Sequence, residues 1–322
     1  MSRTARHTPA SRSLLLIDSL LGLAAFATAV PTLLALAAAQ AWWLELFSHF
    51  RLQYLAAQLV LLAALALRRR WRMSLLLIPL AALNASATSA YWPREPNPVS
   101  GRPDVRIMTA NLYEDASDAA RFIPQAQRED PDVLALVEFS HEWQAALSTL
   151  TAEYPYSSLE PRHGSFGIAL LSRLPIIEQR SFELLSSTTL DVRLALPDGR
   201  ALRLLAVHLR PPQSPRLAGE RNRQLTELGK IVSRIDEPLI VIGDFNTTPY
   251  SPLFKDWSAQ TGLRDARTRW SFSWPASFPL LGIPIDHCMI SEHFIAGEQR
   301  RGEAFGSDHY PILTELYLRG DP

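Results

Sequence analysis

Residues able to bind a metal ion or transfer a proton recur at the ends of apolar runs in the second part of this 322-residue chain. Asn111, Glu138 and His208 each close one such run. A fourth run closes with Gly-Asp-Phe-Asn, which contains Asp244 and Asn246. Charged groups at the ends of buried strands are costly unless they are paired or bind a metal. Their recurrence therefore predicts a functional site.

Two more groups of polar residues follow along the chain. Asp286 lies inside an apolar run next to His287, and Gly-Ser-Asp-His, which ends in Asp308 and His309, precedes the last run. If the strand ends converge, they bring together three to four carboxylates, two histidines and two amides.

These residue types are suited to the hydrolysis of a phosphodiester or a phosphomonoester. Oxygen ligands without cysteine favour Mg²⁺, with Mn²⁺ as an alternative, over zinc. Such a metal neutralises phosphate charge, and a carboxylate or a carboxylate–histidine pair activates water. Amides and a histidine can bind the phosphate oxygens as negative charge develops. Cys288 is the only cysteine, which excludes an intrachain disulfide, and we expect it to be a small buried residue in a strand.

The elements that must position these residues are short apolar strands and amphipathic helices. The turn Asp198-Gly199 predicts a hairpin, and the mixture of strands and helices favours two sheets covered by helices. The expected strands are 105–112, 133–138, 167–172, 192–196, 201–209, 239–243, 283–290 and 312–318, and the expected helices are 117–128 and 217–235.

Seven motifs in this order resemble the endonuclease/exonuclease/phosphatase (deoxyribonuclease I-like) superfamily. They are Thr-Ala-Asn-Leu at 109–112, Leu-Val-Glu at 136–138, Leu-Ser-Arg-Leu-Pro-Ile at 171–176, Val-His-Leu at 207–209, Gly-Asp-Phe-Asn-Thr-Thr-Pro at 243–249, Ile-Asp-His at 285–287 and Ser-Asp-His-Tyr-Pro-Ile at 307–312. The resemblance implies a four-layer α/β (α+β) sandwich, in which two packed mixed β-sheets are flanked by helices and which fills residues 103–322.

The resemblance also implies a role for each matching residue. Glu138 would be the principal Mg²⁺ ligand, with Asn111 and Asp308 close to the metal. The remaining five would act in catalysis: Asp244 and Asn246 would place the attacking water and the phosphate, His208 would stabilise developing charge, Asp286 would orient His309, and His309 would contact the phosphoryl oxygen or act as an acid–base partner. Asp244 and His309 both remain candidates for the general base. Arg173 is expected to brace a loop near the site.

Residues 1–92 form a different region, with apolar stretches at about 14–39, 47–67 and 73–92. About 20 apolar residues cross a bilayer, so we expect about three transmembrane helices and an integral protein of the inner or plasma membrane. Arginines precede the first stretch and lie between the second and third, which places both segments on the cytoplasmic side. Three spans then make the catalytic domain extracytoplasmic, whereas two spans would make it cytoplasmic. The proline-rich residues 93–102 are expected to form a linker.

The expected partners are the membrane and a phosphate-ester substrate, with no obligate protein partner inferred. Residues 101–322 contain 29 acidic and 23 basic residues, a balance that argues against a broad surface for long nucleic acid. A lipid headgroup therefore competes with DNA or RNA as substrate. The alternatives are a membrane-associated nuclease and a catalytically inactive binding module on the same fold.

Overall fold

The computed structural model of this protein describes residues 9–92, 101–113 and 119–320, with side chains from Leu15 onward. The chain divides into two compact units, Met1–Ala90 and Tyr91–Pro322, and each is described by itself. Most of the expected linker and the first residues of the expected helix at 117–128 lie outside the described residues.

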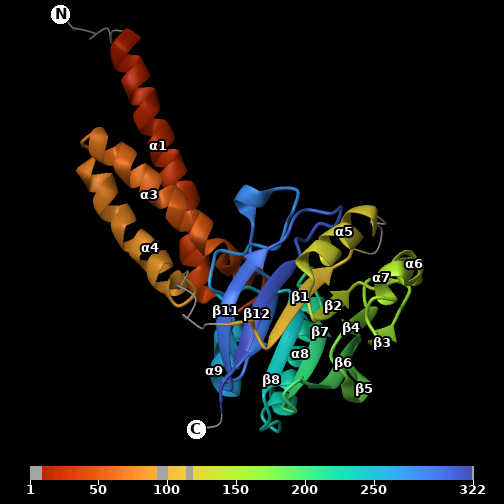
Figure 1. The fold of residues 1–322 in the computed structure, drawn as a ribbon. Coiled ribbons are helices and arrows are strands. Elements are labelled where there is room, and N and C mark those ends of the chain that lie inside the picture. The colour runs from red at the N-terminus through yellow and green to blue at the C-terminus, as the bar shows by residue number, and fades with distance from the viewer. Residues whose placement is uncertain (1–8, 93–100, 114–118, 321–322) are drawn as a thin grey trace, which may run out of the picture. The chain divides into compact units, whose positions relative to one another are not determined.

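The first unit is helical (Figure 1). Its long helices are α1 (Pro9–Leu34), α3 (Arg51–Leu67) and α4 (Trp71–Ser89), and α1 and α3 are joined by η1 (Ala35–Ala37), α2 (Trp42–Glu45) and η2 (Leu46–Phe50). Two segments, Leu15–Ala37 and Trp42–Leu67, are long and apolar enough to cross a membrane. Helix α4 coincides with the third expected stretch, but polar residues such as Asn84 and Thr88 make it less uniformly apolar.

The second unit contains two six-stranded sheets. In spatial order, the first sheet is formed by β11 (Phe294–Arg301), β12 (Ile312–Leu318), β1 (Val105–Asn111), β2 (Val133–Val137), β4 (Ile168–Ser172) and β3 (Tyr156–Glu160). The second sheet is formed by β5 (Ile176–Leu184), β6 (Ser187–Ala195), β7 (Ala201–His208), β8 (Leu239–Asp244), β10 (Asp286–Ile290) and β9 (Arg264–Asp265). Both sheets are mixed, because β1 pairs with β2, and β7 with β8, in parallel.

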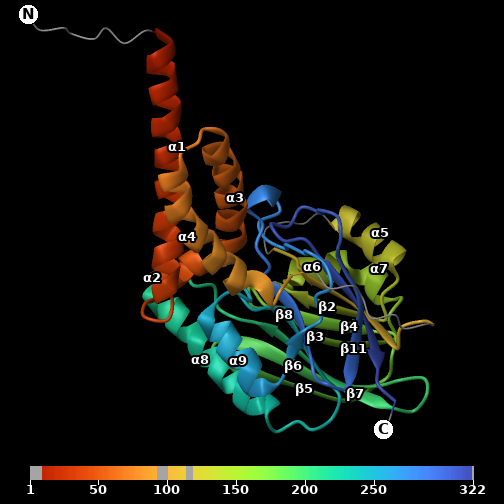
Figure 2. The same cartoon turned by 90° about the vertical axis from the view of Figure 1, so that its left-hand side faces the viewer.

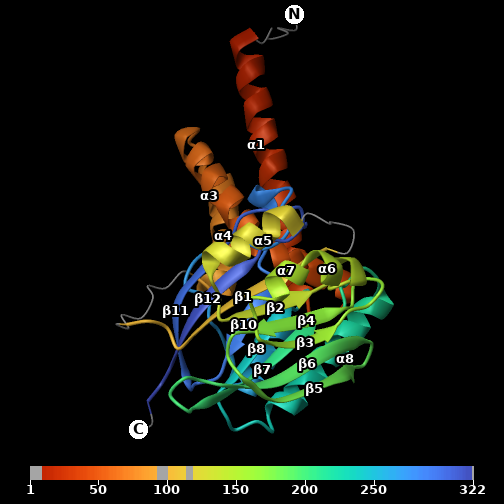
Figure 3. The same ribbon diagram turned by 45° about the vertical axis from the view of Figure 1, so that its right-hand side comes forward.

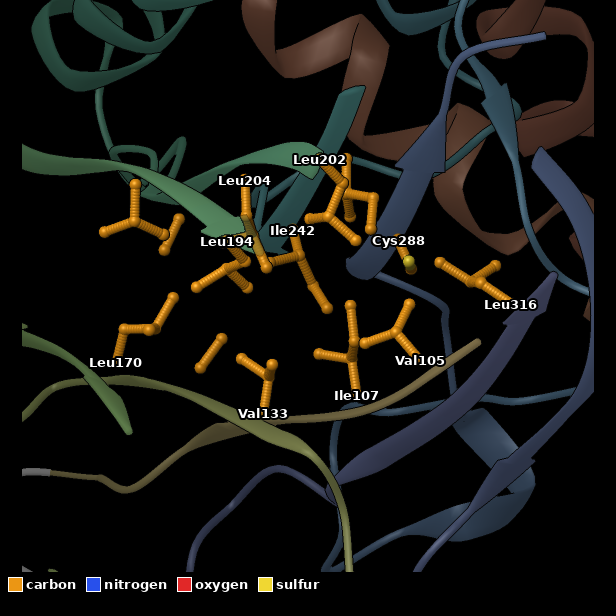
Figure 4. Packing of buried hydrophobic residues seen from close by; sticks show 14 of the residues in the cluster. Val105, Ile107, Val133, Leu170, Leu194, Leu202, Leu204, Ile242, Cys288 and Leu316 are labelled. Atoms are coloured by element: carbon orange, nitrogen blue, oxygen red, sulfur yellow. The ribbon is translucent and has the colours of Figure 1, made fainter. Parts of the chain in front are cut away.

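The main hydrophobic core lies between the two sheets (Figure 4). Ile107 and Val133 from the first sheet face Leu204, Ile242 and Cys288 from the second sheet, and all five side chains are fully buried. Burial raises the pKa of the Cys288 thiol above its usual range, so this residue packs as a small apolar side chain, as predicted.

Helices cover the outer face of each sheet. Helices α5 (Ala119–Glu129), α6 (His141–Ala146) and α7 (Ser148–Thr151) lie over the first sheet (Figure 3) and bury Phe122 and Trp143 there. Helices α8 (Pro215–Val232) and α9 (Pro252–Thr261) lie over the second sheet (Figure 2) and bury Leu228 and Trp257. The expected four-layer sandwich is therefore confirmed.

Individual elements differ from the sequence expectations mainly at edges. Strand β5 was not expected, and most of its residues are exposed at the sheet margin, where no apolar alternation is needed. Strand β10 begins at Asp286 rather than at residue 283, because Pro284 cannot donate to a ladder and Ile283 pairs instead with Trp274. Helix α8 begins at Pro215, where Ser214 accepts a hydrogen bond from the Leu217 amide (3.2 Å).

Candidate active site

The pairing of parallel strands explains why distant polar residues meet. The carboxyl ends of paired parallel strands lie at one edge of a sheet. Asn111 is paired with Val137, the residue before Glu138, and His208 is paired with Asp244. These strand-end residues therefore collect at the same end of the two sheets.

Two antiparallel strands bring the remaining residues to this end. Asp286 opens β10 and is paired with Asp244, because β10 runs antiparallel to β8. The turn before β12 carries Asp308 and His309 beside the end of β1. Ser307 fixes this turn: its hydroxyl donates to the Asn111 carbonyl (2.7 Å) and accepts from the His309 amide (3.0 Å).

Side-chain contacts link the two sheets through Asn111. Its Nδ2 donates to Glu138 Oε1 (3.0 Å) and to Asp244 Oδ2 (3.3 Å). His208 Nε2 lies 3.6 Å from Asp244 Oδ2 and 3.9 Å from Glu138 Oε1. The carboxylate from the first sheet and the carboxylate from the second thus share two neighbours.

His309 lies in the centre of the second half of the cluster. Its Nδ1 donates to Asp286 Oδ2 (2.8 Å), which is the orienting contact expected for Asp286. Its Nε2 lies 3.8 Å from Asp244 Oδ2 and 4.0 Å from Asp308 Oδ1. A continuous chain of short contacts therefore leads from Glu138 to Asp308.

The backbone of the site occupies unusual conformations. Glu138 and Asn246 have positive φ angles of 57° and 49°, which is uncommon for residues other than glycine. Gly243 has φ 134°, and a Cβ there would lie 2.0 Å from the Val207 carbonyl oxygen. The glycine of Gly-Asp-Phe-Asn therefore permits the close approach of β7 and β8 that places Asp244 beside His208.

Asn246 is held by hydrogen bonds to its surroundings. Its backbone amide donates to Asp244 Oδ1 (2.8 Å), and its side-chain Nδ2 donates to the Leu209 carbonyl (2.9 Å). Buried Arg221 on α8 donates to the Asn246 carbonyl (3.0 Å). These contacts fix the turn that follows Asp244.

His309 and Asp286 form a charged pair. Burial alone lowers the pKa of His309, but the charges of Asp286 and Asp244 and the hydrogen bond to Asp286 outweigh it and raise the pKa to about 10. Burial alone raises the pKa of Asp286, and the charge and hydrogen bond of His309 bring it below the ordinary value. His309 is therefore an imidazolium held by a carboxylate at neutral pH.

Asp244 and His208 are shifted towards their neutral forms. Burial and the nearby charge of Asp286 raise the pKa of Asp244 well above its ordinary value. Burial and the positive charge of His309 lower the pKa of His208 to about 4. Since His208 Nδ1 donates to the Ser165 carbonyl (2.9 Å), its neutral ring carries no proton on Nε2.

The cluster fits a divalent cation by its donor chemistry. Ligand atoms of Asp244, Asp286 and His309 lie within 4.8 Å of one another, and the side chains of Glu138, Asn111 and His208 lie beside them. Among the described residues, Asp286 Oδ1 is a buried acceptor without a hydrogen-bond partner. Carboxylate and amide oxygens suit Mg²⁺ or Mn²⁺.

The sequence interpretation missed two sets of supporting residues. From the sequence, Trp274 is expected to pack, with the lining of a substrate groove as the alternative; in the structure its Nε1 donates to Asp308 Oδ2 (2.9 Å). Buried His287 contacts Asp265 Oδ2 through Nδ1 and the Thr247 carbonyl through Nε2, both at 2.9 Å. The adjacent residues Asp286 and His287 indicated that a histidine is buried beside the site. The partner of His287, Asp265, could not be predicted, because it lies in a strand of only two residues.

One expectation about the surroundings of the site is wrong. Arg173 does not brace a loop near the site. It follows β4 at the opposite end of the sheet, where Ser172 pairs with Val133, and it forms an ion pair with Asp130. The antiparallel direction of β4, which the motif alone does not reveal, accounts for this difference.

The fold and the cluster together define a two-sheet sandwich with a carboxylate–histidine centre at one end of its strands. A sequence profile of the endonuclease/exonuclease/phosphatase family matches residues 108–309. The chain therefore belongs to this family, whose members are generally hydrolases of phosphoester bonds and depend on divalent metals.

Solved structures of this family share the fold. An endonuclease/exonuclease/phosphatase from Beutenbergia cavernae is 22% identical, with a TM-score of 0.57 over 69% of this chain and 73% of that one. The catalytic domain of human Nocturnin with bound sulfate is 18% identical, with a TM-score of 0.56 over 69% and 97%. Danio rerio TDP2 complexed with a single-strand DNA product is 15% identical, with a TM-score of 0.55 over 66% and 99%. No curated protein matches in a sequence comparison.

Proposed function

We propose that this protein is a membrane-anchored hydrolase that cleaves a phosphodiester or phosphomonoester with the help of Mg²⁺ or Mn²⁺. The observation that carries the proposal is the convergence of residues from both sheets on one buried cluster of carboxylates and histidines. Burial raises the pKa of Asp244, and the neighbouring carboxylates raise that of His309 in spite of its burial; such shifts are typical of functional sites.

Glu138, Asn111 and Asp308 would hold the metal, with Asp244 and Asp286 close enough to contribute. When bound, the metal neutralises phosphate charge and supports departure of the leaving oxygen. A cation beside Asp244 would also favour its carboxylate form, which the protein alone disfavours by burial.

The protein residues divide the proton transfers between them. His309, protonated and held by Asp286, binds a phosphate oxygen and can protonate the leaving group. Asp244, as a carboxylate with a raised pKa, accepts the proton of the attacking water. We therefore propose Asp244 as the base, because His309, with its pKa raised to about 10, is already protonated.

His208 would act only after it gains a proton. Its Nδ1 hydrogen is already donated to Ser165, so Nε2 can donate to a phosphate oxygen only in the doubly protonated ring. An incoming phosphate anion favours that state. His208 would then stabilise the charge that develops on the phosphate.

The anchoring part of the proposal rests on the burial pattern of the helical unit. Its buried side chains include polar ones: Asn84 Nδ2 donates to Thr32 Oγ1 (2.9 Å) and Gln58 Oε1 (3.0 Å), and Arg51 donates to Asn84 Oδ1 (3.2 Å). Most outward side chains of α4 are apolar, with Leu76 74% exposed, and the exposed polar ones are Arg72, Ser86 and Ser89. A bundle with a polar interior and an apolar surface is suited to lipid.

The ion pairs of this unit fix the direction of its helices. Asp18 in the first half of α1 pairs with Arg68 and Arg70, which follow α3. Arg51 at the start of α3 donates to the Ala35 carbonyl after α1 (2.9 Å) and to Asn84 in the second half of α4 (3.2 Å). Helix α3 therefore runs antiparallel to both α1 and α4. In a bilayer α4 would be a third span, whose buried polar residues lower the apolar character of its sequence. Three spans would make the catalytic domain extracytoplasmic.

The test of catalysis uses the full-length protein in detergent with the bis- and mono-p-nitrophenyl phosphates, in Mg²⁺, in Mn²⁺ and in chelator. We expect Glu138→Gln, Asp244→Asn and His309→Ala each to lower kcat by about 10²- to 10⁴-fold. His141→Ala, a histidine outside the cluster, is the matched control. Full activity in all three variants, or in chelator, would refute the proposal.

The test of topology places an alkaline phosphatase after Pro322 in one fusion and a fluorescent protein in another. The three-span arrangement predicts an active phosphatase, which requires an extracytoplasmic position. A phosphatase that is inactive while the fluorescent fusion folds would place the domain in the cytoplasm.

Nucleic acid is the second candidate substrate. The structural similarity to Danio rerio TDP2, which was solved with a single-strand DNA product, favours it. The acidic balance of residues 101–322 opposes it. Single-stranded and duplex DNA therefore belong among the substrates tested.

A further inference from the structure

A loop beside the active site presents an apolar tip. The segment 270–285 contains no charged residue. Its central part, 275–282, is closed by the pairing of Trp274 with Ile283, and its tip forms the short helix η3 (Pro279–Leu281). Figure 1 shows this loop, in mid-blue, projecting beyond β11 and β12. We call residues 275–282 the rim loop.

The large side chains of the rim loop point to solvent. Phe278 is 66% exposed, Leu280 95% and Leu281 53%. Single exposed apolar residues are common, but three large ones at one tip form a patch that usually marks an interaction site.

The backbone holds this patch outward. The Leu281 amide donates to the Phe278 carbonyl (2.9 Å) and the Gly282 amide to the Pro279 carbonyl (3.1 Å). A Cβ on Gly282 would lie 2.8 Å from Phe272 and 2.9 Å from the Pro279 oxygen, so the tight return of the chain depends on glycine. The exposed side chains are therefore part of a built turn.

The base of the rim loop contacts the active site directly. Trp274 donates to Asp308 Oδ2 (2.9 Å), and the Ala276 amide donates to the Asp308 carbonyl (2.7 Å). Tyr310 donates through its hydroxyl to the Ala276 carbonyl (3.2 Å). A surface bound by the tip would thus lie next to Asp308 and His309.

We propose that the rim loop inserts into a lipid bilayer and that the site cleaves a phosphate ester in the headgroup of a membrane lipid. The substrate part of this inference rests on the proposed function; the insertion part does not. Aromatic and aliphatic side chains with flanking cations are typical of segments that enter the bilayer interface. Exposed Arg269 and Arg301 flank this segment; Arg269 forms an ion pair with Glu298 (3.2 Å), and Arg301 lies over the ring of Tyr310 (3.9 Å).

A bilayer is favoured over a protein partner because the same chain carries candidate membrane helices. The helical unit ends at Ala90, and the first strand of the catalytic unit, β1, begins at Val105. At no more than about 3.5 Å per residue, the intervening residues 91–104 span at most about 50 Å. With its anchor in a bilayer, the catalytic domain would therefore stay within reach of a lipid surface.

The insertion test uses the single buried cysteine to advantage. Because Cys288 is fully buried, Leu280→Cys in the full-length protein can be labelled selectively with an environment-sensitive fluorophore. In nanodiscs of phosphatidylcholine and phosphatidylglycerol, we expect blue-shifted emission that lipid-borne quenchers reduce. A label on Gln179→Cys, an exposed position on edge strand β5, is the control and should remain unquenched. Equal, solvent-like emission from both labels would overturn insertion.

The substrate test compares lipid with a soluble ester. Against phosphatidylglycerol, a phosphoinositide and sphingomyelin in nanodiscs, Leu280→Asp should lower the rate on the cleaved lipid at least about tenfold, because an apolar anchor is replaced by a charge. Hydrolysis of bis-p-nitrophenyl phosphate should be unchanged. The conservative Leu280→Met should retain the lipid rate.

The outcomes separate the two proposals. Equal loss on the lipid and the soluble ester would overturn the rim-loop role, and so would an unaffected lipid rate. Cleavage of single-stranded or duplex DNA but of no lipid would overturn the lipid substrate while leaving hydrolysis intact. No turnover of any ester would refute the proposed function, and the label would still decide insertion.

Discussion

The two units of this chain place polar groups in opposite ways. In the catalytic unit, apolar side chains such as Ile107 and Ile242 fill the interior, and polar groups gather at one end of the sheets. In the helical unit, Thr32, Gln58 and Asn84 are fully buried while leucines cover the outside. The difference supports the proposal that the helical unit lies in lipid and the catalytic unit in water.

The same contrast applies to charge. Asp286 and His309 are buried together and joined by a hydrogen bond, and the proposed mechanism uses the charges of both. Arg51 is buried in the helical unit, where its hydrogen bonds to Ala35 and Asn84 join helices. We therefore interpret the buried charges of Asp286 and His309 as catalytic and the buried charge of Arg51 as structural.

The largest expected effect tests whether the buried charges of the catalytic unit act in hydrolysis. Asp286→Asn preserves shape but removes the charge that holds His309 as an imidazolium, so we expect kcat to fall about 10⁴-fold. Steady-state hydrolysis of bis-p-nitrophenyl phosphate measures it. His141→Ala should leave kcat unchanged. If Asp286→Asn retains more than about a tenth of the activity, Asp286 does not orient His309.

The second largest expected effect concerns buried Asp265, which contacts His287 and Arg267 beside the site. Burial alone raises the pKa of Asp265, but the charge of Arg267 and the hydrogen bond of His287 outweigh it and place that pKa below its ordinary value. Ionised Asp265 therefore stabilises the fold above the unfolded pKa of about 3.9, and this contribution is lost as pH falls through the lower folded pKa. We expect Asp265→Asn to cost about 4 kcal/mol at pH 7.

Thermal unfolding followed by tryptophan fluorescence measures this cost across pH. The deficit of Asp265→Asn relative to the parent protein should shrink below about pH 4, because the parent loses the same charge there. Asp198→Asn, an exposed turn carboxylate, serves as control with an expected change within about 0.5 kcal/mol. A deficit that is constant with pH would show that the carboxylate charge is not what Asp265 contributes.

The sequence predicted β1, β2, β7 and β8 because each of them is an apolar run with a polar residue at or directly after its end. Ile312–Leu318 has the predicted limits, and Glu138 directly follows β2. Strand β5 could not be predicted from an apolar pattern, because most of its side chains are exposed. Arg173 was misplaced because a motif gives residue order but not strand direction.

The limits of sequence reasoning were greatest where a contact depends on side chains that are far apart in the chain. Trp274 looked like a packing residue, since nothing in its neighbourhood shows that its ring nitrogen faces Asp308, 34 residues later. Asn84 and Thr88 looked like weaknesses in an apolar helix. Their burial against α1 and α3 shows instead that they form its interior side.

A charge placed on an exposed leucine in each unit tests whether that leucine faces lipid or water. Leu76 on α4 and Leu185 in the catalytic unit are both exposed. Leu76→Asp should cost about 3 kcal/mol of membrane insertion if α4 faces lipid, whereas Leu185→Asp in water should change stability by less than about 0.5 kcal/mol. The fraction of each variant recovered in membranes after carbonate washing measures the first cost. Equal recovery of both variants would place the exposed face of α4 in water.

The smallest expected effect tests how much a buried polar contact contributes inside the bundle. Asn84→Ala removes the hydrogen bonds to Thr32 and Gln58, yet side-chain hydrogen bonds between membrane helices contribute only about 0.6 kcal/mol on average and at most about 1.7 kcal/mol. We therefore expect a loss of about 1 kcal/mol in unfolding by sodium dodecyl sulfate, well below the cost of Asp265→Asn. Asn84 also accepts from Arg51, and truncation leaves that guanidinium one acceptor short. A loss as large as that of Asp265→Asn would mean that the bundle interior behaves like the core of the catalytic unit, and the two units would then share one kind of surroundings.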